Sequence, residues 1–268
     1  RVMMVAMARI DQRLEQDVDL PALYERVLEA SSAADAEAEG EGRGAGCPLD
    51  RVDADQIEAC IEAQVRSLFA ELHQPADEIP DRFYADVGRQ LREEREFIQR
   101  ALSRGAPIVP ELERALVAKK MPPLLHYIAL IESGYRAEAR SRQGAVGLWQ
   151  FMEPTAREYG LEVSGSIDER KDIAKSSAAA AHYLQHLVFE FGSDALLLAL
   201  AGYNHGQGKV RGKLKQLDDP FSDRSYWRLV ETGLLPEETA LYVTRFVAAA
   251  IAGEGGVPSR AALAAVGY

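Results

Sequence analysis

The chain has 268 residues, a net charge of −11 and a hydrophobic share of 47%. A negative charge of this size repels polyanions, so nucleic acids and acidic membrane surfaces are not expected partners. The hydrophobic share is typical of a folded globular protein, which excludes fibrous and fully disordered classes.

The N-terminal part predicts helices followed by a linker. Residues 2–30 have the spacing of one or two amphipathic helices, and residues 31–48 form an acidic linker rich in Ala, Gly and Glu. The first residues lack the apolar stretch and cleavage site of a signal peptide. Cys47 and Cys60 are too few for a disulfide scaffold, and they could be either a disulfide or two thiols.

The rest of the chain also predicts helices, because Ala, Leu, Glu and Arg dominate and no stretch alternates apolar and polar residues. The expected helices cover residues 53–73, 81–103, 122–133, 172–191, 196–201 and 237–252. Glycine-punctuated loops are expected at 134–151 and 202–208. No apolar run approaches the roughly 20 residues that a membrane-spanning helix needs. The fold class is therefore all-α.

Glu132 is the first candidate for chemistry. It follows Leu125 and Ile128 on one apolar helix face, and it lies in the last helical turn before Gly134. Burial and the negative end of the helix dipole both raise the pKa of a carboxyl group, which suits a general acid near neutral pH. The alternative is a partly exposed surface glutamate.

Two further segments have the residue types of a sugar site. In the segment 141–152, Trp149, Gln150 and Met152 offer a stacking ring, an amide and a flexible thioether beside two glycines. A structural loop around a buried tryptophan is the alternative. Tyr203 and Asn204 precede a second glycine-rich segment and could present polar groups to a cleft, or form only a helix cap and turn.

Several motifs follow one another in a fixed order over about residues 108–252. They are Glu132-Ser133, Gly144-Ala145-Val146-Gly147-Leu148-Trp149-Gln150-Phe151-Met152, Tyr159-Gly160-Leu161, Asp168-Glu169-Arg170, Tyr203-Asn204-His205-Gly206, and Leu235-Pro236-Glu237-Glu238-Thr239 with Tyr242-Val243. In this order they resemble soluble-type (SLT domain) lytic transglycosylases, most closely the branch of membrane-bound lytic transglycosylase D.

The resemblance implies a lysozyme-like (goose-type/SLT) domain over residues 106–268, preceded by a helical region over 1–105. It implies non-hydrolytic cleavage of the bond from N-acetylmuramic acid to N-acetylglucosamine in peptidoglycan. Glu132 would act as acid and then base, closing a 1,6-anhydro ring. No cofactor or metal is required. The implied substrate-binding residues are Ser141, Gln150, Met152, Tyr203, Asn204, Glu238 and Tyr242.

Two other functions compete with this hypothesis. A hydrolase similar to goose-type lysozyme would need a further carboxylate to position water, and a glycan-binding scaffold would keep the cleft without turnover. The candidates for that further carboxylate are Glu138, Glu153, Glu158 and Glu238.

The remaining expectations concern location, partners and metals. The resemblance implies the bacterial cell envelope, in the periplasm. The N-terminal helices could dock a protein partner. His182 and His186 lie four residues apart on one predicted helix, and a surface or core pair is favoured over a metal site because no third ligand is evident.

Overall fold

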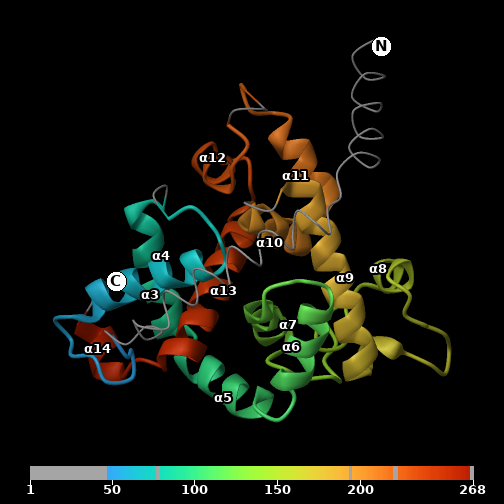
Figure 1. Ribbon diagram of the computed structural model, residues 1–268, viewed down its shortest axis with the longest axis horizontal. Coiled ribbons are helices and arrows are strands. Elements are labelled where there is room, and N and C mark those ends of the chain that lie inside the picture. Colours follow the sequence, from blue (N-terminus) through green and yellow to red (C-terminus); the bar gives the residue numbers. More distant parts are fainter. Residues whose placement is uncertain (1–46, 77–78, 193–194, 220–222, 266–268) are drawn as a thin grey trace. The chain divides into compact units, whose positions relative to one another are not determined.

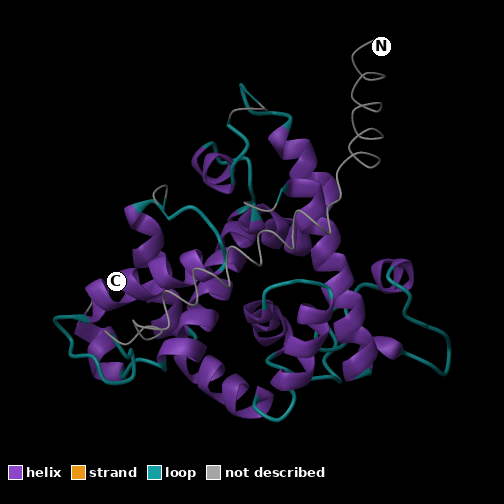
Figure 2. Cartoon of the chain, in the orientation of Figure 1, coloured by secondary structure: helices purple, strands orange, loops and turns teal. Residues whose placement is uncertain are grey.

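The computed structural model describes residues 47–76, 79–192, 195–219 and 223–265. Within these residues the regular elements are helices, joined by loops that form only isolated antiparallel bridges (Figures 1 and 2). The predicted all-α class is confirmed. The expected helices over 2–30 and most of the acidic linker lie outside the described residues.

The helices are α3 (Ile57–Glu71), α4 (Asp81–Glu93), α5 (Arg95–Gly105), α6 (Val109–Ala118), η1 (Pro123–His126), α7 (Tyr127–Ser133), α8 (Glu153–Glu158), η2 (Glu169–Lys171), α9 (Ile173–Phe191), α10 (Leu196–His205), α11 (Gln207–Leu214), α12 (Tyr226–Glu231), α13 (Glu237–Gly255) and α14 (Arg260–Ala265).

Helix α13 lies at the centre of the packing. Its apolar side chains are fully buried over most of its length, including Val243, Phe246 and Val247. It packs against α3, α4, α7 and α10, so helices from before and after residue 106 share one hydrophobic core. Figure 1 shows this red helix running beside the blue-green helices α3 and α4. The boundary expected near residue 106 stays a prediction.

Two of the expected helices are each divided. The helix expected over 81–103 is two helices, because the backbone at Glu94 leaves helical geometry (φ −100°, ψ 6°) before α5 begins. The helix expected over 122–133 begins as the 3-10 turn η1 and continues as α7. Proline at the start of η1 fits there because the first turn of a helix needs no backbone N–H donor.

The prediction of a loop over residues 202–208 is wrong. Helix α10 continues to His205, and α11 begins at Gln207 after the single residue Gly206, which has φ +94°. Gly202 lies inside α10, where a Cβ atom would approach the Phe191 ring to 2.8 Å. This glycine therefore allows close packing of α9 against α10 and does not form a turn.

The sequence left open whether the two cysteines form a disulfide or remain free thiols, and the structure shows a disulfide. Cys47 and Cys60 form a disulfide with a Cα–Cα distance of 5.5 Å. The bond fixes the segment before α3 to the first turns of that helix. Leu49 is fully buried nearby, and its backbone N–H donates to the Gly255 carbonyl oxygen at the end of α13.

Candidate active site

Glu132 lies in the last turn of α7, where the sequence predicts a general acid. Gly134 ends the helix in the left-handed conformation (φ +61°), and Ile128, one turn earlier on the same face, is fully buried. The Glu132 side chain is half-buried. Burial raises the pKa of its carboxyl to about 7, against a hydrogen bond from Tyr242 and the charge of Arg245, which both lower it. The group can therefore release and regain a proton near neutral pH.

Two tyrosines from distant helices lie beside this carboxyl. The Tyr242 hydroxyl, on α13, donates a 2.9 Å hydrogen bond to Oε1 of Glu132. The Tyr203 hydroxyl, on α10, donates to the carbonyl oxygen of Trp149 at 2.8 Å. Burial and the negative charge of Glu132 raise the pKa of both hydroxyls well above the usual range, so both remain neutral hydrogen-bond donors. The structure thus brings together three residues that the sequence singles out.

The glycine-rich loop after α7 is built around Arg170. The Arg170 guanidinium donates to both carboxylate oxygens of Asp168, at 2.7 and 2.9 Å, and to the carbonyl oxygens of Gly144 and Phe151. The Arg170 carbonyl lies against Gly147, where a Cβ atom would come within 1.8 Å of that oxygen. Gly147 also has φ +88°. A side chain at this position therefore has no room.

Side-chain hydrogen bonds fix the same loop to its neighbouring helices. The Ser133 hydroxyl lies 2.9 Å from the Leu148 carbonyl oxygen, so the residue after Glu132 connects α7 to the loop. The indole N–H of Trp149 donates to the Ser177 hydroxyl on α9, and Trp149 is fully buried. Trp149 is therefore part of the core, and the sugar-stacking hypothesis does not apply to its ring.

Three other predicted binding residues lie in or beside this loop. The Ser141 hydroxyl accepts a hydrogen bond from the Ala145 N–H at 3.0 Å. The Gln150 side-chain amide donates to the Gly147 carbonyl oxygen at 2.7 Å. Met152, in contrast, is exposed just before α8. Ser141 and Gln150 thus shape the loop through these bonds, while Met152 is open to solvent.

Asn204 and Glu238 lie on two other helices. Asn204 is half-buried near the end of α10, and Glu238 is exposed in the first turn of α13. Burial and nearby lysines lower the pKa of His205, and the charge of Glu238 acts in the opposite direction, which places Glu238 near this histidine. Among the described residues, no hydrogen bond connects either side chain to Glu132.

Arg245 and Glu94 belong to the surroundings of Glu132, although the sequence analysis missed both. Arg245 lies on α13 one turn after Tyr242, and its Nη2 donates to Oε2 of Glu94 at 3.1 Å. Its Nε lies 2.6 Å from Oε1 without the alignment of a hydrogen bond. The three-residue spacing from Tyr242 could have revealed Arg245. No local pattern marks Glu94, which comes from the junction of α4 and α5.

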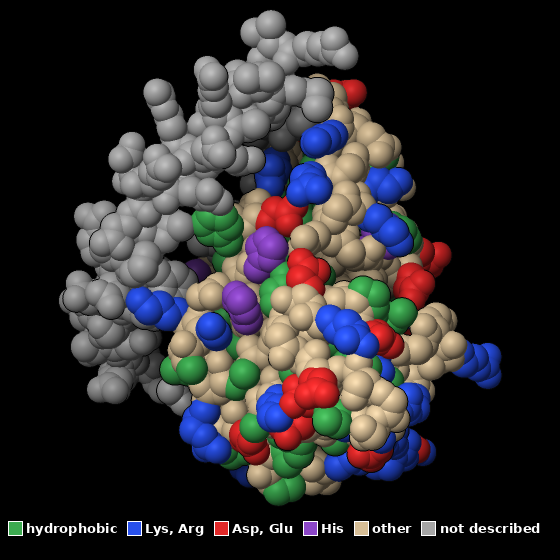
Figure 3. All heavy atoms as spheres, turned by 90° about the vertical axis from the view of Figure 1, so that its right-hand side faces the viewer, with side chains coloured by type: hydrophobic (Ala, Val, Ile, Leu, Met, Phe, Trp, Pro, Cys, Tyr) green, Lys and Arg blue, Asp and Glu red, His purple; other side chains and the backbone are tan. Residues whose placement is uncertain are grey.

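His182 and His186 are both exposed and both contact Tyr159 on the outer side of α9. The Tyr159 hydroxyl lies 2.6 Å from Nδ1 of His186. The view from this side shows histidines among interspersed acidic and basic side chains (Figure 3). In the described part of the chain, no three His, Cys, Asp or Glu side chains are grouped as metal ligands, and no helix has the length and apolarity to span a membrane.

A carboxyl with a near-neutral pKa that accepts a hydrogen bond from one neutral tyrosine and lies near another forms a site suited to general acid–base chemistry. Residues 112–222 match the family model of the transglycosylase SLT domain. Over these residues the chain is similar to the SLT family.

Individual relatives are similar over parts of the chain. Membrane-bound lytic murein transglycosylase D of Escherichia coli is 30% identical over 168 residues, which cover 63% of this chain and 36% of that protein. Peptidoglycan transglycosylase gp16 of Escherichia phage T7 is 40% identical over 88 residues, 32% of this chain and 7% of that protein. The chain thus spans about a third of the length of the first of these relatives.

One solved structure also matches the chain. An inactive mutant of lytic transglycosylase Slt from Pseudomonas aeruginosa matches with a TM-score of 0.48 and 20% identity. The match covers 95% of this chain and 46% of that one.

Proposed function

We propose that the protein is a peptidoglycan lytic transglycosylase that cleaves the bond from N-acetylmuramic acid to N-acetylglucosamine without water. The observation that carries the proposal is the Glu132 carboxyl, which has a pKa of about 7 and accepts a hydrogen bond from Tyr242. A single group that serves first as acid and then as base needs a pKa near the working pH. The match of residues 112–222 to the SLT domain supports this choice of reaction.

In the first step, protonated Glu132 gives its proton to the glycosidic oxygen as the bond to C1 of the muramoyl residue breaks. The N-acetylglucosamine side then leaves with a hydroxyl group. The substrate's own 2-acetamido group stabilises the positive centre at C1, so no carboxylate nucleophile is needed. In the second step, ionised Glu132 takes the proton of the muramoyl C6 hydroxyl as its oxygen bonds to C1. A 1,6-anhydro ring forms and Glu132 is protonated again.

The two tyrosines orient and tune this group. Tyr242 donates to the carboxylate form of Glu132 and so stabilises the intermediate state in which the proton has left. Tyr203 is held against the loop by its bond to the Trp149 carbonyl oxygen, and its position beside Glu132 puts its hydroxyl near the reacting centre. Ser141, Gln150, Met152, Asn204 and Glu238 remain the proposed contacts to the sugar.

A hydrolase on the same scaffold is the second candidate, and the surroundings of Glu132 argue against it. Most glycosidases place two carboxyl groups about the scissile bond. The pKa of Glu132 responds to burial, Tyr242 and Arg245, and the carboxylate that belongs to these surroundings, Glu94, is paired with Arg245.

Of the four glutamates that could position water, two form ion pairs with basic side chains and two are exposed to solvent. Glu138 pairs with Lys171, and Glu153 pairs with Arg157 at 2.9 Å. The other two candidates are exposed. Transfer to the C6 hydroxyl therefore remains the better explanation. A glycan-binding scaffold without turnover would not need a carboxyl with a pKa near neutrality, and so is less well supported.

The proposed substrate is the glycan strand of bacterial peptidoglycan, which would place the protein in the cell envelope, in the periplasm. Docking of a protein partner by the N-terminal helices rests on residues outside the described part. It stays a prediction.

Digestion of purified peptidoglycan followed by mass spectrometry tests the proposal. The natural chain should release 1,6-anhydro-muropeptides, and Glu132→Gln, which keeps the shape of the side chain, should release none. Reducing-end muropeptides would show a hydrolase instead. Products of neither kind from a correctly folded chain would favour a binding scaffold.

A further inference from the structure

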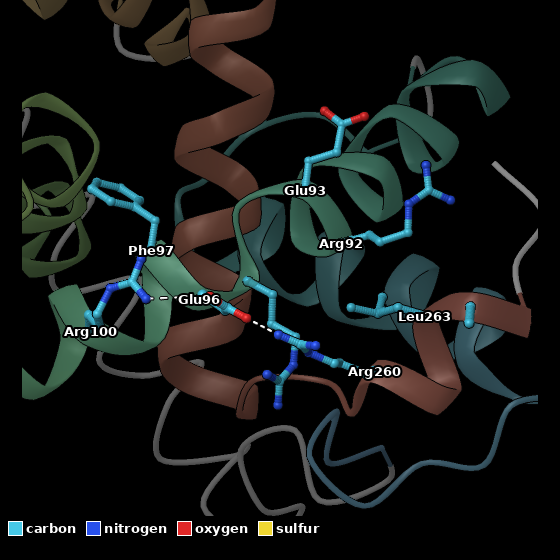
Figure 4. Close-up of a pocket in the computed structure, with 9 residues that line it drawn as sticks. Arg92, Glu93, Glu96, Phe97, Arg100, Arg260 and Leu263 are labelled. Carbon is cyan, nitrogen blue, oxygen red and sulfur yellow. Dashed lines mark hydrogen bonds and ion pairs between the residues drawn. The ribbon is translucent and has the colours of Figure 1, made fainter.

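A cavity of about 410 Å³ lies between the end of α4, α5 and α14 (Figure 4). It is separate from the Glu132 carboxyl, which does not line it. Its charged lining is formed by four arginines and two glutamates, namely Arg92, Arg95, Arg100, Arg260, Glu93 and Glu96. The lining thus has an excess of positive charge in a chain whose net charge is −11.

The positive charge is only partly neutralised within the cavity. Glu96 pairs with both Arg100 and Arg260, and Figure 4 shows it between these two side chains. Arg95 donates to neutral oxygens, the Pro258 carbonyl at 2.7 Å among them. Arg92 forms no ion pair or side-chain hydrogen bond with any residue that the structure describes. Two guanidinium groups therefore face the cavity without a carboxylate partner.

The rest of the lining is apolar. Leu263 is buried and Phe97 is half-buried, so the arginines stand beside a hydrophobic surface. A guanidinium binds a carboxylate through two parallel hydrogen bonds, and an apolar surface next to it suits a short aliphatic segment. A long polyanion would be repelled by the rest of this acidic chain. The lining thus favours a small ligand that has both carboxylate and apolar groups.

Phe97 also connects the cavity to the candidate active site. Its ring lies against Gly134, where a Cβ atom would come within 3.2 Å of a ring carbon. Gly134 ends the helix that carries Glu132, and the Arg104 side chain on α5 donates to the Gly134 carbonyl oxygen. Helix α5 therefore contacts the end of α7 on one side and lines the cavity with Phe97 and Arg100. A ligand in the cavity would lie next to the segment that positions Glu132.

We propose that the cavity between α4, α5 and α14 is a binding site for an acidic peptide, with Arg92 and Arg95 holding its carboxylates. If the proposed function is correct, the ligand is the peptide attached to muramic acid, and that identification rests on the proposed function. The peptide would then be bound at a site distinct from the cleaved bond. The arginine site itself does not depend on catalysis.

Titration of the full chain with the dipeptide L-Ala-D-Glu at millimolar concentrations tests the proposal. Binding is measured from chemical-shift changes in NMR spectra. This probe has no sugar, so binding is measured without turnover. Arg92→Gln should weaken binding about ten-fold or more, because one charge-assisted interaction is lost. Arg89→Gln is the matched control, since Arg89 lies one turn earlier on α4, pairs with Asp86 and does not line the cavity. It should bind as the natural chain does.

A second probe is the same dipeptide with both carboxyl groups amidated, which should bind at least ten-fold more weakly. The proposal is overturned if the dipeptide does not bind, if Arg92→Gln binds it unchanged, or if the amidated peptide binds equally well. The digestion assay is read separately. If the natural chain does not bind the dipeptide but still releases anhydro products, only the proposed peptide site is rejected. If it binds the dipeptide but releases no anhydro products, only the proposed reaction is rejected.

Discussion

The Tyr242 hydroxyl donates a 2.9 Å hydrogen bond to Oε1 of Glu132, across 110 residues of sequence. Two opposing effects act on the pKa of Glu132. Burial raises the pKa of Glu132 to about 7, and the hydrogen bond lowers it because it stabilises the carboxylate. Tyr242 therefore fixes the direction of the carboxyl and keeps its two protonation states close in free energy.

Removing this hydroxyl should change both the rate and its pH dependence. Glu132 must be protonated to act as an acid, so activity falls as pH rises through its pKa. In Tyr242→Phe the pKa rises, and the alkaline limb of the pH profile should move to higher pH while the maximal rate falls about 10–100-fold. Release of soluble products from peptidoglycan between pH 5 and 9 measures both. Tyr226→Phe is the control, because that hydroxyl donates to the Ala240 carbonyl oxygen. If the alkaline limb of Tyr242→Phe stays at the same pH as in the natural chain, Tyr242 does not lower the pKa of Glu132.

Substitutions of Arg245 and of Glu94 should shift the alkaline limb of the pH profile in opposite directions. The positive charge of Arg245 lowers the pKa of Glu132, so Arg245→Gln should move the alkaline limb to higher pH. Glu94 partly neutralises this guanidinium, and Glu94→Gln should move the limb to lower pH. Arg211→Gln, which removes an arginine paired with Glu190 on the surface, should leave the profile unchanged. Shifts in the same direction for both variants would indicate a general loss of structure instead.

The sequence predicts this site in part. The apolar face before Glu132 and the glycine after it are local features, and local features predicted both the helix end and the raised pKa. Tyr203 was singled out by its sequence context only as a possible cleft residue, and Tyr242 entered through the resemblance to a family. The approach of both to Glu132 depends on how three helices pack. The partnership of Arg245 with Glu94 could not be predicted, because the two residues lie on elements that meet only in the folded chain.

For the loop after α7, in contrast, the sequence did not predict what the residues do. Its glycines and Trp149 are conspicuous in the sequence, and their composition suits a sugar. In the structure the ring of Trp149 is buried and Gln150 donates back to the Gly147 carbonyl oxygen. Composition alone cannot separate a residue that binds a ligand from one that supports the backbone around it. What organises the loop is Arg170, which donates to the carbonyl oxygens of Gly144 and Phe151 and to the Asp168 carboxylate.

Ionisation of Glu132 should make the folded state less stable as pH rises. Its pKa is about 7 when folded and 4.5 in the unfolded reference, so the folded state binds the proton more tightly. The free energy of unfolding then falls between pH 4.5 and 7 and loses no more above that range. One pKa unit corresponds to about 1.4 kcal/mol, so the effect is of the order of a few kcal/mol.

Glu132→Gln should remove this dependence. The variant should be more stable than the natural chain at pH 8, and their difference should shrink toward pH 4. Urea unfolding at the two pH values measures the difference. Glu153→Gln serves as control, since it lies on the exposed face of α8. A stability gain that is equal at both pH values would show that Glu132 ionises in the folded state as it does in the unfolded chain.

The glycine-rich loop offers a test in which two similar substitutions should differ. Gly144 and Gly147 have φ of +93° and +88°, so alanine at either position has the same unfavourable backbone conformation, which costs about 1–2 kcal/mol. A Cβ atom at Gly144 meets no atom within 4 Å, whereas at Gly147 it would lie 1.8 Å from the Arg170 carbonyl oxygen.

Gly147→Ala should therefore destabilise the protein by about 3 kcal/mol more than Gly144→Ala, because backbone must move to relieve the contact. Urea unfolding of the two variants measures this difference directly. The displaced Arg170 backbone would also disturb the loop that ends at Met152, so activity should fall further in Gly147→Ala than in Gly144→Ala. Equal destabilisation by the two variants would mean that the loop can move away from Arg170 at little cost, and that Arg170 does not fix the loop beside Glu132.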